Sequence, residues 1–540
     1  MLGLMADYPL LISDIIKHAD KHHHDTEVVS RVADGSIHRY TYRDAHKRCR
    51  QLANALDRLG TREGDRIGTL AWNSYRHFEI YFAVAGSGRV THTINPRLFP
   101  EQIKWIIDHA EDEVIFVEPI FLEVVQKILP SLKKTPKIVM LTDREHMPPA
   151  DTIPNMLCYE DLLENETHEY EWPKLDENVA SGLCYTSGTT GDPKGVLYSH
   201  RSTVLHSLII TLPDSMCLSA RDTVMPVVPM FHVNAWGVPY CAPLIGAKLV
   251  LPGAALDGKS LYELFEQEKV TISMGVPTVW LGLLQFLKDN NLKFSTFQRT
   301  VVGGSACPES MIRAFEENYG VRVHHAWGMT ELSPMGSLCK LKGTQLEEPK
   351  EKQQESLRKQ GRVVPFMDWK IVDGDGKELD WDGKSSGELM VNAPWSIREY
   401  FKSGTSALVD GWFPTGDVAT IDPNGFMQIT DRRKDVIKSG GEWISSIELE
   451  NLAIAHPAVK EAAVIARSHP KWDERPLLIV VKEEGSELTA EELLKFYEGK
   501  IAKWWIPDDV VFVDQMPHTA TGKLQKMKLR EQYGEFVPKT

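Results

Sequence analysis

Short apolar runs and a helical pattern alternate in the front of the chain, and this alternation limits the fold more than any other feature. Val114–Val117 and Ile138–Leu141 predict two buried strands, and residues 121–132 between them predict a helix. Parallel strands need such a crossover connection, so this order predicts parallel pairing. Upstream, Thr41 and Asp44 predict a capping box at the start of another helix. The pattern therefore predicts an α/β fold.

Chain length and charge set further limits. The 540 residues exceed the ~250–300 residues at which single cores stop growing, so we expect more than one domain. Lys and Arg total 61 against 75 Asp and Glu, a net charge of −14, which argues against broad nucleic-acid binding. With 42% hydrophobic and 25% charged residues, the composition is that of a globular protein and excludes disorder, collagen and coiled coil.

The segment from Met225 to Ala255 has one charged residue, Lys248, and raises the question of a membrane span. Proline removes a backbone donor and disrupts a helix. Five prolines interrupt the segment: Pro226, Pro229, Pro239, Pro243 and Pro252. No uninterrupted apolar run of about 20 residues remains, so a spanning helix is not expected. We expect instead a buried segment of strands and turns that lines a pocket.

The cysteines and the N-terminus indicate a compartment. Seven cysteines are scattered without a C-x-x-C pair, which favours free thiols in a reducing cytosol. Residues 1–17 lack the basic region, apolar core and cleavage site of a signal peptide. We therefore expect a cytoplasmic protein.

The adjacent histidines His22, His23 and His24 are more typical of a solvated helix than of a metal site, and no metal is assigned to them.

Composition changes near residues 431–435, which read Asp-Arg-Arg-Lys-Asp. The following residues predict helices capped at Ser445 and Thr489 and three short strands, a set of about 105 residues that suits a small α+β domain. The predicted organisation is a domain over residues 1–430, a hinge at 431–434 and a domain over 435–540.

Residues 185–195, Tyr-Thr-Ser-Gly-Thr-Thr-Gly-Asp-Pro-Lys-Gly, form the sharpest motif. Its glycines permit close backbone approach, its hydroxyls donate hydrogen bonds and Lys194 supplies charge, so the loop predicts a concave anion site. It matches neither the Walker A pattern nor G-x-G-x-x-G. The loop therefore favours a protein that handles a polyphosphate and is neither a P-loop ATPase nor a Rossmann dehydrogenase. The alternative is a plain Gly/Ser/Thr linker.

This loop resembles the signature of the adenylate-forming superfamily, which includes acyl-CoA synthetases, luciferases and adenylation domains. Five more segments resemble its motifs in the expected order: 301–305, 327–331, 411–417, 431–434 and 521–523. Met230–Trp236 and Ile437–Ile444 look most like bacterial fatty acyl-CoA synthetases, particularly the medium-chain group, with 3-(methylthio)propionate–CoA ligases almost as close. The resemblance implies a large N-terminal α/β domain with stacked sheets and a small mobile C-terminal α+β domain.

The implied activity is that of an ATP-dependent carboxylic acid–CoA ligase, with Mg²⁺ as cofactor and a homodimer as the expected assembly. A carboxylate attacks the α-phosphate of ATP to give acyl-AMP and pyrophosphate, and the thiol of CoA then displaces AMP. Because an anion attacks an anion, the site must neutralise charge. A medium-chain fatty acid is the favoured substrate, and 3-(methylthio)propionate and long-chain acids are the alternatives.

The resemblance also assigns nucleotide-binding residues. Thr330 would contact the α-phosphate, and Glu331 would hold Mg²⁺, which prefers oxygen ligands. Asp417 would accept the ribose hydroxyls; Arg432 would add a contact, although a solvated arginine is its alternative. The phosphate loop would contribute Thr186, Ser187, Gly188, Thr189, Thr190 and Lys194. The adenine side would consist of Gly303, Gly304, Ser305, Trp327, Gly328 and Met329.

Other residues would serve catalysis and the acyl and CoA sites. Lys523 would bridge the carboxylate and the α-phosphate, and Lys434 would be the hinge about which the small domain turns. His232 would lie near the carboxylate, Trp236 would gate the acyl tunnel, and Trp327 would shape its mouth; ordinary core packing is the alternative for His232 and Trp236. The CoA-side residues would be Lys438, Ser439, Gly440, Gly441 and Trp443.

The chain departs from the family pattern at two places. Relatives usually have Gly-Pro and then Gly-Tyr after Gly387-Glu-Leu389, where this chain has Ala393-Pro394 and Glu399-Tyr400.

Two other classes of function compete with the ligase. A luciferase-like oxygenase or a carrier-loading enzyme would share these motifs, and so would a non-catalytic sensor, because fold does not fix function. The presence of Lys194, Glu331, Asp417 and Lys523 argues against the sensor.

Overall fold

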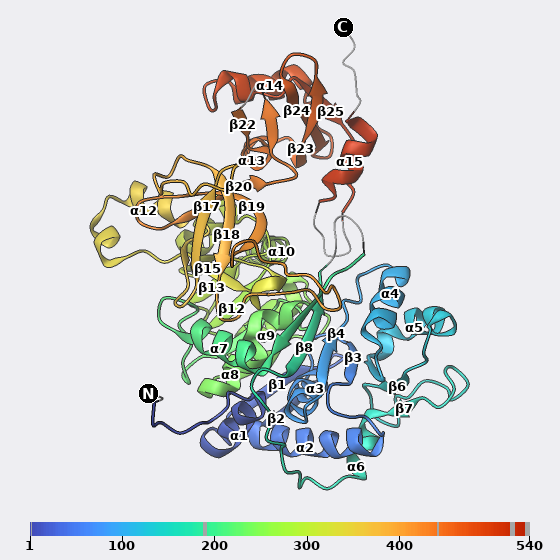
Figure 1. The fold of residues 1–540 in the computed structure, drawn as a ribbon. Coiled ribbons are helices and arrows are strands. Elements are labelled where there is room, and N and C mark those ends of the chain that lie inside the picture. The colour runs from blue at the N-terminus through green and yellow to red at the C-terminus, as the bar shows by residue number, and fades with distance from the viewer. Residues whose placement is uncertain (2, 187–191, 440–441, 519–523, 535–540) are drawn as a thin grey trace. The chain divides into compact units, whose positions relative to one another are not determined.

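The structure is a computed structural model that describes residues 1, 3–186, 192–439, 442–518 and 524–534 (Figure 1). The chain divides into two compact units. The first consists of residues 1–188, 192–368 and 392–408. The second consists of residues 189–191, 369–391 and 409–540.

The first unit contains a seven-stranded sheet in the order β7-β6-β5-β3-β4-β8-β9. Its strands are β3 (Arg66–Leu70), β4 (Val90–Thr93), β5 (Val114–Val117), β6 (Lys137–Met140), β7 (Leu157–Cys158), β8 (Ala180–Tyr185) and β9 (Gly195–Ser199). The pairs from β7 to β8 are parallel, and only β9 runs antiparallel to its neighbour. The predicted crossover is confirmed, because β5 and β6 pair in parallel on either side of α5 (Leu122–Ile128).

A nine-stranded sheet in the order β16-β15-β14-β13-β12-β10-β11-β1-β2 completes the strand framework of this unit. Its strands are β1 (Glu27–Arg31), β2 (Ile37–Thr41), β10 (Thr223–Pro226), β11 (Lys248–Leu251), β12 (Ile272–Gly275), β13 (Arg299–Val302), β14 (Arg322–Gly328), β15 (Met335–Leu338) and β16 (Arg362–Val363). The central pairs are parallel and the edge pairs antiparallel. Its central strands are almost continuously buried, as in sheets covered on both faces.

Helices fill the spaces around these sheets (Figure 1). Besides α5 they are α1 (Ile12–His22), α2 (Tyr42–Arg58), α3 (Tyr75–Gly86), α4 (Pro100–Ala110), α6 (Tyr159–Glu164), α7 (His200–Thr211), α8 (Val238–Ile245), α9 (Gly258–Gln267), α10 (Pro277–Asp289), α11 (Glu309–Arg313) and α12 (Lys350–Leu357). The capping box predicted at Thr41 is confirmed, because Thr41 and Asp44 exchange both bonds at the start of α2. Helix α3 is buried along its length except at Arg76.

The uncharged segment differs from its prediction at α8, since strands and turns were expected and residues 238–245 form a helix. Pro239 lies in its first turn, where a backbone N–H has no partner within the helix. Pro243 lies inside the helix, where its ring removes one backbone bond that a short buried helix can forgo. Among the described residues, none of the helices has the length and apolar character that crossing a bilayer requires.

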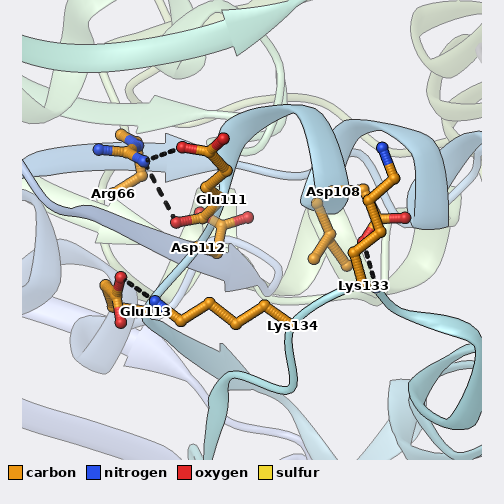
Figure 2. Close-up of a pocket in the computed structure, with 8 residues that line it drawn as sticks. Arg66, Asp108, Glu111, Asp112, Glu113, Lys133 and Lys134 are labelled. Atoms are coloured by element: carbon orange, nitrogen blue, oxygen red, sulfur yellow. Dashed lines mark hydrogen bonds and ion pairs between the residues drawn. The ribbon is translucent and has the colours of Figure 1, made fainter.

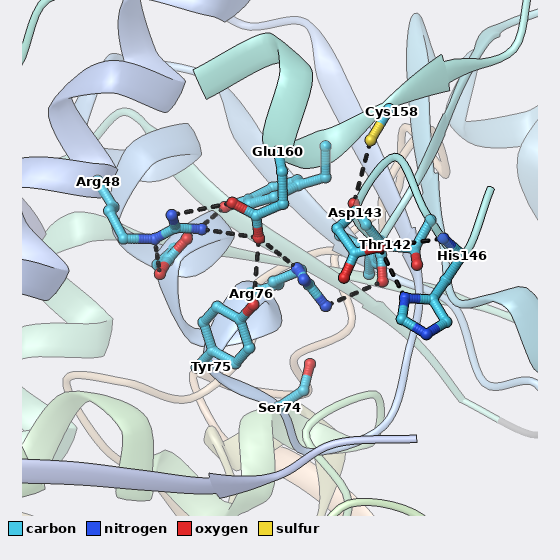
Figure 3. A network of polar contacts seen from close by, with 12 residues as sticks. Arg48, Ser74, Tyr75, Arg76, Thr142, Asp143, His146, Cys158 and Glu160 are labelled. Carbon is cyan, nitrogen blue, oxygen red and sulfur yellow. Dashed lines mark hydrogen bonds and ion pairs between the residues drawn. The ribbon is translucent and has the colours of Figure 1, made fainter. Parts of the chain in front are cut away.

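A buried ionic network joins α2, α3 and α6 (Figure 3). Glu160 accepts hydrogen bonds from Arg48 at 3.0 Å and from Arg76 at 2.7 Å. Arg48 also donates to Glu79 at 2.7 Å, and Glu79 is fully buried. Burial raises the pKa of Glu79, while the Arg48 guanidinium opposes that shift. Because each charge has a partner, the network holds three helices together without an isolated buried ion.

The second unit has two sheets of its own. The four-stranded sheet consists of β17 (Asp368–Val372), β18 (Gly387–Asn392), β19 (Phe413–Ile421) and β20 (Met427–Arg432). The five-stranded sheet consists of β21 (Ile437–Ser439), β22 (Glu442–Ile444), β23 (Val459–His469), β24 (Asp473–Lys482) and β25 (Asp509–Phe512), with β25 parallel to β24. Its helices are α13 (Ser446–Ile454), α14 (Ala490–Tyr497) and α15 (Lys526–Tyr533). The three strands and two helix starts predicted here are present, and the hinge at 431–434 stays a prediction.

Candidate functional site

The predicted phosphate loop connects β8 to β9 in a hairpin, not a strand to a helix as in a P-loop. Tyr185 and Gly195 are partners across the two strands. Next to them, the N–H of Thr186 donates to the carbonyl of Lys194 at 2.9 Å. The side chain of Lys194 is exposed at the base of the loop. The predicted residues Ser187, Gly188, Thr189 and Thr190 lie outside the described residues.

Thr330 and Glu331 lie just after β14, in a short 3₁₀ helix over residues 330–332. Both are nearly buried, with 8% and 7% of their surface exposed. The hydroxyl of Tyr198, on the strand that leaves the phosphate loop, donates to the carbonyl of Thr330 at 2.6 Å. The hydroxyl of Tyr400 donates to Oε1 of Glu331 at 2.8 Å. The Glu331 carboxylate is therefore fixed in orientation.

Tyr400 also lies next to Lys194. The Lys194 ammonium is 4.9 Å from the centre of the Tyr400 ring, within the range of a cation–π contact. The structure thus brings the predicted phosphate cation and the predicted magnesium ligand to one aromatic ring. Sequence reasoning noted Tyr400 only as a local departure and missed this role. The sequence does contain a signal for it: Tyr400 follows Gly387-Glu-Leu389 at the place where relatives have a tyrosine.

His232 precedes five consecutive residues with left-handed backbone. From Val233 to Gly237 the φ angles are 45, 53, 47, 57 and 83°. Only glycine and, less so, asparagine visit this region readily, and other residues pay roughly 1–2 kcal/mol each. The surrounding protein holds the turn in place: the Tyr81 hydroxyl lies 2.5 Å from the carbonyl of Met230 and 3.1 Å from Oδ1 of Asn234.

The left-handed turn places the indole of Trp236 against Gly303. A Cβ at Gly303 would lie 3.1 Å from Cη2 of Trp236 and 3.1 Å from the carbonyl oxygen of Ala326. The missing side chain therefore makes room for the indole. The predicted acyl gate and the predicted adenine-side segment meet here. Gly304 and Ser305 are exposed beside them, and His232 is half-buried.

Trp327 is buried near the end of β14, the strand that pairs with β13. A Cβ at Gly336 on β15 would lie 2.4 Å from Cζ3 of Trp327, so the indole lies flat on a strand position that only glycine allows. Gly328 ends β14, and Met329 follows it. The adenine-side residues of the first unit therefore lie at or just after the carboxyl ends of the neighbouring parallel strands β13 and β14, where α/β sheets usually bind ligands.

In the second unit, Asp417 and Arg432 are cross-strand partners on β19 and β20. Asp417 is 1% exposed, and the Arg432 Nε is 2.8 Å from its Oδ1. The predicted ribose ligands are thus adjacent and form an ion pair. Lys434 follows in the turn after β20, and burial lowers its pKa.

The CoA-side prediction falls on the β21–β22 hairpin. Lys438 is exposed and its N–H donates to Glu474 at 2.7 Å, and Ser439 is buried. Trp443 pairs with Lys438 in the hairpin register. Gly440, Gly441 and the catalytic candidate Lys523 lie outside the described residues.

Arg97 is a candidate functional residue that sequence reasoning missed. Its guanidinium carbon lies 5.2 Å from the ring centre of Trp72 and 5.9 Å from that of Phe231, the neighbour of His232. Burial lowers its pKa, and no Asp or Glu of the described chain forms an ion pair with it. In the sequence it looks like an ordinary loop cation after Asn-Pro, and only the fold shows the aromatic rings beneath it.

A cavity of about 320 Å³ lies elsewhere in the first unit, around α4 and the start of β5 (Figure 2). Two of its three cations already have carboxylate partners. Arg66 is 3.1 Å from Glu111, and Lys134 forms an ion pair with Glu113. The backbone N–H of Lys133 donates to Asp108. It contains none of the predicted residues, so it is not the candidate site.

Comparisons with known proteins agree on one family. Residues 16–401 match the AMP-binding enzyme family, and residues 448–523 match the AMP-binding enzyme C-terminal domain. The medium-chain-fatty-acid–CoA ligase of Ectopseudomonas oleovorans is 53% identical over 540 residues, 99% of this chain and 98% of its own. The 3-methylmercaptopropionyl-CoA ligase of Ruegeria lacuscaerulensis is 52% identical over 538 residues, 99% of this chain and 100% of its own.

Solved structures share the fold. The anthranilate CoA ligase AuaEII, solved with anthranoyl-AMP, superposes with a TM-score of 0.85 at 25% identity and covers 97% of this chain and 98% of its own. ATP-bound MatB from Rhodopseudomonas palustris superposes with a TM-score of 0.81 at 23% identity, covering 97% and 100%. The predicted fold class, a large N-terminal α/β part and a small C-terminal part, is confirmed.

Proposed function

Because the chain belongs to the AMP-binding enzyme family of adenylate-forming proteins and is an AMP-forming acid–CoA ligase, we propose that it activates a medium-chain fatty acid. ATP and CoA are its other substrates. The observation that carries the substrate proposal is the 53% identity to a medium-chain ligase along both full chains. The apolar segment around Trp236 supports it, since an apolar ligand needs an apolar wall.

In the proposed first step, the acid carboxylate attacks the α-phosphate of ATP and pyrophosphate leaves. Lys194 and the loop residues Thr186, Ser187, Gly188, Thr189 and Thr190 bind the β- and γ-phosphates. Thr330 contacts the α-phosphate, and His232 lies near the carboxylate. Residues 303–305 and 327–329 are the proposed adenine-side contacts, and Asp417 and Arg432 are the proposed ribose ligands. These groups offset the charge that otherwise keeps two anions apart.

Glu331 fits the role of a magnesium ligand. Mg²⁺ prefers oxygen donors and is often bound by one or two carboxylates together with substrate phosphates. Glu331 supplies a carboxylate whose orientation the Tyr400 hydroxyl fixes. When bound, Mg²⁺ would supply positive charge to the triphosphate, and the residues of this chain would orient the carboxylate and the phosphates around it.

The second step needs the C-terminal part. Lys523 completes the adenylation site, and rotation about Lys434 then exchanges it for the CoA-side residues Lys438, Ser439, Gly440, Gly441 and Trp443. The thiol of CoA attacks the acyl carbonyl, and AMP leaves with its oxygen. This proposal separates the two half-reactions by residue. A substitution in one set is expected to spare the other half-reaction.

In the acyl site, Trp236 is the proposed gate. Its indole fills the space that Gly303 leaves, at the boundary between the nucleotide and acyl sides. ATP binding on the Gly303 side would displace the ring and open the channel. Trp327 shapes the mouth of that channel.

One other substrate is supported by a specific observation. The 3-methylmercaptopropionyl-CoA ligase named above is 52% identical to this chain, only one percentage point below the medium-chain ligase. A short thioether acid and the front of a medium acyl chain present similar apolar surface, so 3-(methylthio)propionate is the second candidate.

Acid-dependent exchange of labelled pyrophosphate into ATP tests the proposal, followed by thioester formation with CoA. The panel is butyrate, octanoate, palmitate and 3-(methylthio)propionate. We expect the highest kcat/KM with octanoate and thioester only when free CoA is present. A higher kcat/KM with 3-(methylthio)propionate would replace the proposed substrate with the second candidate. Exchange without thioester formation would favour a carrier-loading enzyme.

A further inference from the structure

Tyr400 contacts both charged groups of the phosphate side through different parts of its side chain. Its hydroxyl donates to Glu331 Oε1 at 2.8 Å, and its ring lies 4.9 Å from the Lys194 ammonium. The three residues are far apart in the sequence: Lys194 and Glu331 belong to the segment 192–368 of the first unit, and Tyr400 belongs to the segment 392–408. One side chain thus couples a carboxylate and an ammonium that the proposed reaction needs at the same triphosphate.

The hydroxyl is suited to hold a carboxylate. The ordinary pKa of a phenol is about 10, so the hydroxyl keeps its proton near neutral pH and remains a donor. A carboxylate has two oxygens and about four acceptor positions, so one hydrogen bond leaves capacity for a cation. The bond therefore sets the orientation of Glu331 without occupying the whole group.

The ring is suited to hold the ammonium without neutralising it. A cation–π contact restrains Lys194 but adds no negative charge. Within the described parts of the chain, no Asp or Glu side chain forms an ion pair with Lys194. Its positive charge thus stays available for phosphate oxygens.

The backbone on both sides of Tyr400 is tied to the same two segments. The N–H of Ile397 donates to the carbonyl of Glu331 at 2.8 Å, and the N–H of Phe401 donates to the carbonyl of Gly195 at 2.8 Å. Residues 397–401 therefore connect the segment of Glu331 to the strand that begins directly after Lys194. The position of the ring between the two groups follows from this connection.

We propose that Tyr400 is a positioning residue that sets the Glu331 carboxylate and the Lys194 ammonium in one arrangement for the triphosphate of ATP and its divalent cation. The proposal rests on the proposed function. It predicts that removing the hydroxyl weakens the response to Mg²⁺, whereas removing the ring also weakens the binding of ATP. The acyl side is expected to be unaffected, because none of these contacts involves residues 230–237.

The test compares Tyr400→Phe, which keeps the ring, with Tyr400→Leu, which removes both contacts. Tyr42→Phe is the matched control, since it also loses a buried hydroxyl bond, the 2.6 Å bond to the carbonyl of Ala247. Calorimetric titration with α,β-methylene-ATP at several Mg²⁺ concentrations measures binding without turnover. Pyrophosphate exchange with octanoate measures the KM of the acid alongside.

For Tyr400→Phe we expect the Mg²⁺ concentration for half-maximal analogue binding to rise about five- to tenfold, with the KM of octanoate within about twofold. Tyr400→Leu should also weaken analogue binding at saturating Mg²⁺. A double-mutant cycle with Glu331→Gln separates positioning from folding: the Mg²⁺ effect of Tyr400→Phe should vanish in the Glu331→Gln background.

Superimposable Mg²⁺ titrations for wild type and Tyr400→Phe would overturn the inference, and so would an equal effect in the Glu331→Gln background. Equal losses for Mg²⁺, ATP and octanoate would show a merely structural role. Absence of acid-dependent exchange in the wild type would count against the proposed function instead. The binding cycle would still decide the role of Tyr400 in that case.

Discussion

Asn73 accepts a hydrogen bond from the backbone N–H of Met230 at 2.6 Å. The same amide donates to the carbonyl of Pro226 at 2.8 Å and to that of Val228 at 2.9 Å. One side chain thus satisfies three backbone groups of the segment that leads into the left-handed turn. With 2% of its surface exposed, Asn73 has no water to replace these partners.

Substitution of Asn73 by Asp is expected to lower stability strongly. Aspartate has nearly the same shape but cannot donate, so two buried carbonyls lose their partner and face a carboxylate. We expect the free energy of unfolding of the first unit to fall by about 3 kcal/mol. Chemical denaturation measures it. Asn165→Asp is the control, because the exposed Asn165 donates to one carbonyl only; equal losses in both variants would contradict the account.

Substitution of Gly303 by Ala is expected to impair substrate binding. The new Cβ would lie 3.1 Å from the Trp236 ring and from a backbone oxygen that cannot move easily, so the ring must shift. We expect the KM values for ATP and octanoate each to rise about tenfold. Steady-state kinetics measure this. Gly282→Ala, with no atom within 4 Å of the new Cβ, is the control, and an unchanged Gly303→Ala enzyme would refute the packing argument.

His206 is expected to make stability fall at low pH. Burial lowers its pKa to about 3, and its Nε2 accepts a hydrogen bond from the N–H of Met335 at 3.0 Å, so it is neutral in the folded protein. The unfolded chain binds the extra proton below its ordinary pKa of 6.5. Stability is therefore complete above that value and decreases as the pH falls from 6.5 towards 3, by about 1.4 kcal/mol at pH 5.5 for this group.

The melting temperatures of His206→Gln and wild type at pH 7.5 and pH 5.5 test this expectation. Glutamine can keep an acceptor for Met335 and does not titrate, so the variant should lose less stability between the two pH values. His146→Gln is the control, since His146 is exposed and its neighbour Asp143 raises its pKa. An identical pH dependence in His206→Gln and wild type would show that His206 does not contribute.

Substitution of Trp236 by Ala is expected to uncouple acid binding from ATP. With the indole gone, the channel stays open and octanoate should bind equally well with and without α,β-methylene-ATP. Wild type should bind it more tightly when the analogue is present. Calorimetry measures both. An unchanged affinity and an unchanged dependence on the analogue would rule out the gate.

Elements with strong local signals could be predicted from the sequence. The crossover between β5 and β6 follows from the periodicity of apolar residues, and the capping box follows from the spacing of Thr41 and Asp44. Both are present. Segments that resemble the family's motifs could also be found, because each is a short contiguous pattern; the roles of their residues stay predictions.

Features set by tertiary contacts could not be predicted. Val233, Ala235 and Trp236 have no preference for positive φ, so only packing and the Tyr81 contact explain the left-handed turn. Helix α8 was missed because the cost of a proline depends on its position in the helix, which the pattern does not give. Tyr400 and Glu331 are 69 residues apart, and no local pattern joins them.

The most direct test of the account is a comparison of the two half-reactions in Lys523→Ala with octanoate. Without CoA, wild type should form octanoyl-AMP and release pyrophosphate, and added CoA should convert it to octanoyl-CoA and AMP. Lys523→Ala should form almost no octanoyl-AMP yet convert supplied octanoyl-AMP to the thioester at a rate near that of wild type. Equal loss of both half-reactions in the variant, or thioester formation by wild type without an octanoyl-AMP intermediate, would contradict the proposed mechanism.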